Sequence, residues 1–248
     1  MKYFTFLILL FLLLINYSFT QNDTTNAEYY KLYDAYLLPK NLGILNGREY
    51  LDIFPESILG AKTNNKFYGS FDFLRGYVLY DGQPYYNIKL KYELIHDLLL
   101  LPFVHERMNF LSLNPEMVDE FILKGSKFKR LPKVLELNSI YGNGFFKEEY
   151  EGKEFFLYVK YVKKAVEKIE GRSLKYDFRE SRFYIIGHKN QYYQITSKKR
   201  LTEIFPSLRK AIKLFYRKNK TLKRNDKEQF YINLLKNLDY LGSRNEVK

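Results

Sequence analysis

Residues 76–94 read GYVLYDGQPYYNIKLKYEL, and this stretch indicates how the chain folds. From Tyr86 to Leu94, apolar or aromatic side chains alternate with polar ones, which is the two-residue period of a strand with one buried face. Asp81-Gly82 separates this run from the apolar run before it, and both residue types accept the positive φ angles of a tight hairpin turn. The stretch therefore predicts two antiparallel strands joined by a two-residue turn.

The same two-residue period continues on both sides of this hairpin, from about residue 67 to residue 196. The connections are too short for crossover helices, so the strands are expected to pair antiparallel. About nine or ten such strands, each with one polar face, should curl into a half-barrel or fold over as a sandwich. The further predicted strands cover 97–101, 104–111, 117–123, 127–131, 144–150, 154–163, 182–187 and 191–196.

After Ser197 the apolar period becomes helical. A first helix follows Pro206, with Leu208, Ala211, Ile212 and Phe215 on one face. A second helix is predicted from an Asn225 cap to Gly242. The fold class predicted is thus α+β and mainly β, a curled antiparallel sheet followed by two C-terminal amphipathic helices that pack on it.

The amino terminus has the layout of a secretory signal peptide over residues 1–20. Lys2 precedes the apolar run from Phe4 to Ile15, and small residues follow as far as Thr20. The run is shorter than the ~20 residues of a spanning helix, although a membrane anchor is the alternative. Cleavage would leave a chain that begins at Gln21 and has no transmembrane segment. Three regions would follow: a leader over 21–66 with a short helix and loops, an antiparallel β domain over 67–196, and a basic helical tail over 197–248.

Composition narrows the classes of protein that the chain could represent. It has 248 residues, of which 46% are hydrophobic and 18% aromatic, and it contains no Cys. Disulfide scaffolds and thiolate metal sites are therefore excluded. No Gly-x-Ser-x-Gly elbow occurs, and His96, His105 and His188 lack the spacing of a zinc motif. We predict no catalytic residue, no metal site and no cofactor.

Positive charge is concentrated in the tail. The chain carries a formal charge of +13, and the residues from Ser197 onward contribute fifteen Lys and Arg against five acidic residues. Arg209, Lys213 and Arg217 recur every four residues on the face opposite the apolar stripe of their helix. Such a face attracts phosphate-rich surfaces, including anionic lipid and lipopolysaccharide. Nucleic acid would also satisfy this charge, but the predicted export disfavours it as a partner.

Tyrosines form the second group of candidate binding residues. Tyr86 and Tyr92 belong to one group on the hairpin, and a second group pairs Tyr158 and Tyr161 with Tyr192 and Tyr193. Tyrosine stacks on sugars and packs at interfaces with its hydroxyl in water, so either group could line a ligand groove. Tyrosine is also favoured on any half-buried sheet.

Several short motifs resemble an uncharacterised family of exported proteins from Gram-negative envelopes. The similarity covers about residues 44–240 and implies export to the periplasm or cell surface, and it implies no active-site residue. The motifs are Asn46-Gly47-Arg48-Glu49-Tyr50, the stretch from Gly76 to Tyr86, Gly144-Phe145-Phe146 and Ile204-Phe205-Pro206.

Together these features predict a non-catalytic exported envelope protein that binds or scaffolds another protein or an outer-membrane component. Two alternatives remain open. The first is a periplasmic carrier of a lipid-like or aromatic ligand. This alternative rests only on analogy with lipid chaperones, in which a curled sheet encloses a ligand cavity. The second is a hydrolase that uses a pair of carboxylates in a groove.

Overall fold

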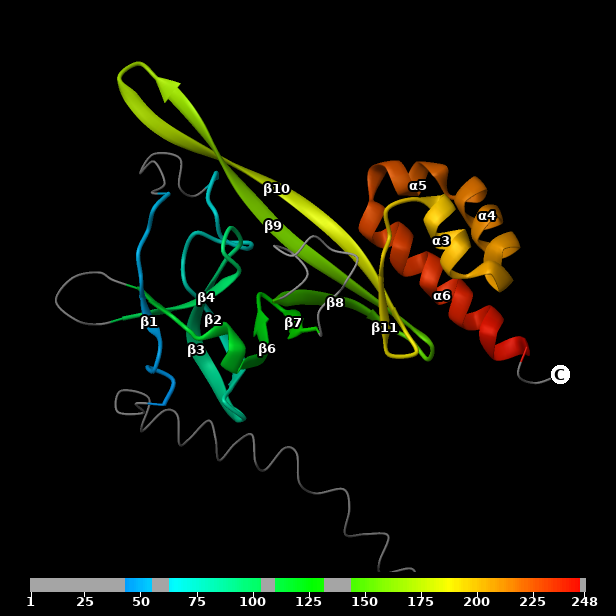
Figure 1. The fold of residues 1–248 in the computed structure, drawn as a ribbon, viewed down its shortest axis with the longest axis horizontal. Coiled ribbons are helices and arrows are strands. Elements are labelled where there is room, and N and C mark those ends of the chain that lie inside the picture. Colours follow the sequence, from blue (N-terminus) through cyan, green and yellow to red (C-terminus); the bar gives the residue numbers. More distant parts are fainter. Residues whose placement is uncertain (1–42, 55–62, 104–109, 132–143, 246–248) are drawn as a thin grey trace, which may run out of the picture.

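The computed structural model describes residues 43–54, 63–103, 110–131 and 144–245 (Figure 1). The predicted signal peptide, the short helix expected in the leader, at about residues 27–37 of the 21–66 region, and most of the strand expected over 104–111 lie outside the described residues. Eleven strands form one antiparallel sheet in the order β1-β5-β4-β3-β2-β6-β7-β8-β9-β10-β11. The strands are β1 (Arg48–Tyr50), β2 (Leu74–Tyr80), β3 (Gln83–Glu93), β4 (Leu98–Pro102), β5 (Phe110–Ser112), β6 (Val118–Leu123), β7 (Ser126–Arg130), β8 (Phe145–Glu151), β9 (Phe155–Glu170), β10 (Ser173–His188) and β11 (Gln191–Gln194).

The hairpin predicted from residues 76–94 is present as β2 and β3. Tyr80 pairs with Gln83, and the turn residues Asp81 and Gly82 have φ angles of 52° and 72°. Gly76, on β2, lies where two backbones approach closely, since a Cβ there would be 2.5 Å from the carbonyl oxygen of Ile122 on β6. The local turn chemistry and one glycine thus position the strands at the middle of the sheet.

The prediction of a half-barrel or sandwich is wrong, because the sheet is neither closed nor strongly curled. The apolar face of its β8–β11 end is covered by helices instead of by more sheet. One core cluster joins Leu157 and Ile186 of the sheet to Ile212, Leu234 and Leu238 of the tail, all fully buried. Helix packing buries this face, so the sheet has no need to fold over on itself.

Strands β9 and β10 are much longer than predicted. They pair over sixteen positions, from Phe155 opposite His188 to Glu170 opposite Ser173, around a turn that contains Gly171 with a φ angle of 63°. Figure 1 shows this ribbon extending past the rest of the sheet. Residues 164–181 were not predicted as strand, since their charged side chains hide the two-residue period.

The tail contains more helical segments than the two predicted. They are α3 (Lys198–Ile204), the 3₁₀ turn η2 (Pro206–Leu208), α4 (Arg209–Lys218), α5 (Lys220–Asn225) and α6 (Lys227–Asn245); a further 3₁₀ turn, η1 (Pro115–Met117), precedes β6. The cap of α6 is Asp226, whose Oδ1 accepts a hydrogen bond from the Gln229 amide (2.9 Å), so the predicted Asn225 cap is wrong. Gly242 does not end α6; a Cβ there would lie 3.0 Å from a Glu154 carboxylate oxygen, so Gly242 is a packing position.

Candidate basic cleft in the helical tail

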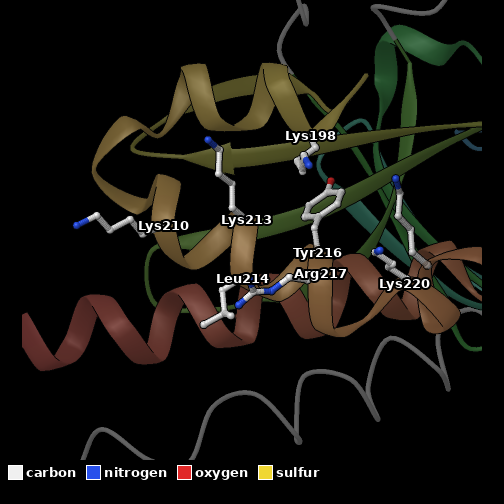
Figure 2. Close-up of a pocket in the computed structure, with 8 residues that line it drawn as sticks. Lys198, Lys210, Lys213, Leu214, Tyr216, Arg217 and Lys220 are labelled. Carbon is white, nitrogen blue, oxygen red and sulfur yellow. The ribbon is translucent and has the colours of Figure 1, made fainter.

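A cleft of about 910 Å³ lies between α3, α4 and α5 and is lined mainly by basic residues (Figure 2). We call it the basic cleft. None of its eight lining residues is acidic, and six are cationic. The lining residues are Lys198, Lys210, Lys213, Leu214, Tyr216, Arg217, Lys220 and Lys223.

The amphipathic pattern of α4 explains how three of these cations reach the cleft. Ile212 and Tyr216 are buried on one face, and the Tyr216 ring packs edge-on against Phe230 of α6 at 4.8 Å between ring centroids. Lys210, Lys213 and Arg217 lie at i, i+3 and i+7 and are exposed. Spacing of this kind places the three side chains on one side of a helix.

The junction between α4 and α5 brings the next cations into the same cleft. α4 ends at Lys218 and is capped by Asn219, whose side-chain amide donates to the Phe215 carbonyl (3.0 Å), and α5 begins at Lys220. This short connection places Lys220 and Lys223 beside α4, and the Lys223 ammonium lies 5.0 Å from the centre of the Tyr216 ring. Such a cation–π contact favours a position of the ammonium group beside the Tyr216 ring, which also lines the cleft.

The positive charge of the basic cleft also affects a residue that does not line it. Burial, followed by the nearby positive charge of Lys223, lowers the pKa of Lys227. Burial raises the pKa of the Tyr216 hydroxyl, so Tyr216 stays neutral and does not offset the positive charge. A cluster of cations without a lining carboxylate is stabilised when an anion enters it.

The structure brings together two of the three basic residues predicted from helical spacing. Lys213 and Arg217 line the cleft, whereas Arg209 is not among the lining residues. Lys210 takes the third place on α4, because i+3 and i+7 spacing matches the cleft-facing side of the helix more closely than repeated steps of four. The cations from α3 and α5 could be found in the sequence only as part of the general charge excess.

The two tyrosines predicted on the hairpin lie far from the basic cleft, since β3 and the tail helices occupy opposite ends of the molecule in Figure 1. Tyr92 is completely buried, and its hydroxyl donates to Asp97. The Tyr92 ring therefore belongs to the core and presents no surface to a partner. Tyr86 is half-buried, with its ring 5.0 Å from that of Tyr77 on β2.

A second charged cluster, which the sequence did not indicate, ties α6 to the sheet. Glu228 in the first turn of α6 accepts a hydrogen bond from the Tyr161 hydroxyl (2.9 Å), and the Arg182 guanidinium lies 3.4 Å from the same carboxylate. Lys147 of β8 lies 3.6 Å from Glu228 and also pairs with Glu149. We call these five residues the helix clasp.

Burial is the main cause that raises the pKa of Glu149 to about 7, and the neighbouring Glu228 raises it further while Lys147 opposes the shift. Two close carboxylates could in principle serve the hydrolase alternative. In this structure they lie between β8 and α6, where their side chains are only 11% and 19% exposed, and neither lines the basic cleft. The geometry assigns the pair to the attachment of the helix.

The described residues were also compared with the requirements of a metal site and of a membrane-spanning helix. His96 lies 3.0 Å from the Glu93 carboxylate, and His188 faces the Glu154 carbonyl at 3.0 Å. Among the described ranges, no group of three or more His, Asp or Glu side chains is arranged to hold a metal ion. Within the same ranges no helix has the length and apolarity needed to cross a membrane.

Comparison of the chain with protein-family models, curated proteins and solved structures finds no match.

Proposed function

We propose that this protein is a non-catalytic, exported binding module of a Gram-negative envelope, and that its basic cleft takes the phosphate groups of an anionic lipid or lipopolysaccharide. The observation that carries the proposal is that six cations from three helices line one cleft, with no acidic residue among the lining residues that the structure describes. Export rests on the signal-like segment over residues 1–20 and on the resemblance to envelope proteins.

The size of the cleft is compatible with a lipid headgroup. A volume of about 910 Å³ has room for phosphate groups, and cations from α3, α4 and α5 line it. Leu214, which is 42% exposed, lies beside these cations and offers an apolar contact to the part of a lipid next to its headgroup. Each basic residue near an anionic membrane contributes about 1 kcal/mol to binding. Six of them are enough for strong, salt-sensitive attachment.

The proposal is tested by co-sedimentation with vesicles of phosphatidylcholine containing 30% phosphatidylglycerol, compared with vesicles of phosphatidylcholine alone. The test variant replaces three cleft residues together, Lys213→Gln, Arg217→Gln and Lys220→Gln. We expect the parent to bind only the anionic vesicles and to dissociate as salt rises, and the variant to lose most of this binding.

The matched control replaces three cations of the same tail that do not line the cleft, Lys199→Gln, Arg209→Gln and Lys218→Gln. Both triple variants lower the net charge by the same amount, so a difference between them reports the cleft itself. Equal loss in the two variants would mean that diffuse charge is responsible, and equal binding by parent and cleft variant would refute the proposal. A gel-shift experiment with single-stranded nucleic acid tests the competing polyanion.

A further inference from the structure

A second hollow, of about 350 Å³, lies near the turn that joins β10 to β11. We call it the aromatic groove. Its lining contains the rings of Phe156, Tyr158 and Tyr192 and the imidazole of His188, and it includes Gly187. Adjacent residues of β9 and β11, Phe155 and Tyr193, pack on Phe205 in the tail with ring centroids 5.3 and 5.9 Å apart. Because side chains alternate along a strand, the groove opens on the face of the sheet opposite the helices.

Gly187 makes the arrangement of the rings possible. It pairs with Phe156 of β9 on one side and with Tyr192 of β11 on the other. A Cβ at Gly187 would lie 3.2 Å from Cε2 of Tyr158 and 3.5 Å from Cε1 of Tyr192. The missing side chain lets these two rings converge above the backbone, with 6.0 Å between their centroids.

The three larger rings are not equally accessible. Phe156 and Tyr158 are stacked, with an interplanar angle of 10° and centroids 6.3 Å apart, whereas Tyr192 is inclined to Tyr158 by 60°. Tyr158 is only 6% exposed, while Phe156 and Tyr192 are partly exposed. The ring surface that a ligand can reach therefore belongs mainly to Phe156 and Tyr192, which lie on either side of Gly187.

Polar groups surround the rings on the exposed rim. Lys153, Lys189 and Asn190 line the groove and are exposed. Lys189 and Asn190 have φ angles of 50° and 60°, so they form the two-residue turn between β10 and β11, which holds the rim in place beside Tyr192. The rim supplies hydrogen-bond donors from lysine and both donors and acceptors from asparagine.

We infer that the aromatic groove binds a neutral sugar ring of an oligosaccharide. A pyranose has a flat face of C–H bonds that stacks on aromatic rings, and it has hydroxyls at its edge that both donate and accept hydrogen bonds. Stacking of this kind requires no charge on the ligand, and the groove is lined by two cations, Lys153 and Lys189, against six in the basic cleft. Occupation of the groove by a neutral sugar therefore does not depend on the function proposed for the cleft.

The test is saturation-transfer difference NMR of the purified protein with cellotetraose and with chitotetraose, followed by titration to obtain the dissociation constant. We expect saturation of ring protons of at least one saccharide by the parent, with little change between low and high salt. Tyr192→Ala should weaken binding about tenfold, and Tyr192→Phe, which keeps the ring, should retain it.

Tyr86→Ala is the matched control, because it also removes a half-buried tyrosine ring that contacts another tyrosine, at the far end of the sheet. Circular dichroism establishes that each variant is folded. The inference is overturned if the parent binds neither saccharide, if Tyr192→Ala binds as the parent does, or if Tyr86→Ala causes the same loss. It is also overturned if uridine monophosphate occupies the groove while both saccharides do not.

Discussion

The helix clasp makes the stability of the protein depend on pH, and Glu149→Gln isolates this effect. In the folded protein the pKa of Glu149 is raised to about 7, mainly by burial, from a value of 4.5 in the absence of such surroundings. Between these two pH values the folded state holds a proton that the unfolded chain has lost. The contribution of Glu149 to stability is therefore fully present below pH 4.5 and is lost as the pH rises through 7.

The magnitude follows from the size of the shift. At about 1.4 kcal/mol per pKa unit, a shift from 4.5 to about 7 has an upper limit on the order of 3 kcal/mol. The neutral amide of Gln cannot form the ion pair that Glu149 makes with Lys147, which offsets part of the gain. We expect the variant to be more stable than the parent by about 1–2 kcal/mol at pH 8, and to equal the parent or fall slightly below it at pH 5.

The assay is urea denaturation at pH 5 and pH 8, followed by far-ultraviolet circular dichroism. Glu151→Gln is the control, because it removes an exposed carboxylate of the same strand. The quantity compared is the free energy of unfolding of Glu149→Gln minus that of the parent. If this difference stays constant from pH 5 to pH 8, or becomes less favourable to the variant as the pH rises, Glu149 is not held in its protonated form by burial.

Three other predictions concern the core, the tail and the amino terminus. Gly144→Ala should lower stability by about 3 kcal/mol in thermal unfolding, since Gly144 has a φ angle of +96° and a Cβ there would lie 1.6 Å from Asp97 Oδ2; an unchanged melting temperature would contradict this account. Asp239→Ala should cost about 2–4 kcal/mol in chemical denaturation, because the Asp239 carboxylate accepts hydrogen bonds from the Tyr150 hydroxyl (2.6 Å) and the Glu154 amide (2.9 Å), whereas Tyr240→Ala, at an exposed position beside it, should cost less. Amino-terminal sequencing of the exported protein should begin at Gln21, and an intact Met1 in a carbonate-resistant membrane fraction would identify the segment as an anchor.

Local patterns in the sequence determined the secondary structure over much of the described chain. The Asp81-Gly82 turn and the alternation that follows it predicted the β2–β3 hairpin, because both depend on φ angles and side-chain direction within a few residues. The four-residue spacing of Lys213 and Arg217 likewise placed both on one side of a helix, where they line the cleft. Patterns failed over 164–181, since that part of the β9–β10 ribbon has too few buried apolar side chains to produce a period.

Only the tertiary structure decided which surfaces became covered and which residues met. Tyr86 and Tyr92 look alike in the sequence, yet Tyr92 is fully buried beside Asp97 while Tyr86 is only half-buried. The reason is a bulge at Asn87, which has a φ angle of 56°: the pairing of β2 with β3 shifts register there, so Tyr86 faces away from the core that Ile88 and Tyr92 enter. The basic cleft requires cations from three helices, and the helix clasp joins residues more than sixty positions apart. The sheet is open because the tail helices bury its apolar face at the β8–β11 end. Such contacts are set by long-range packing free energy, which the period and composition of any one segment do not contain.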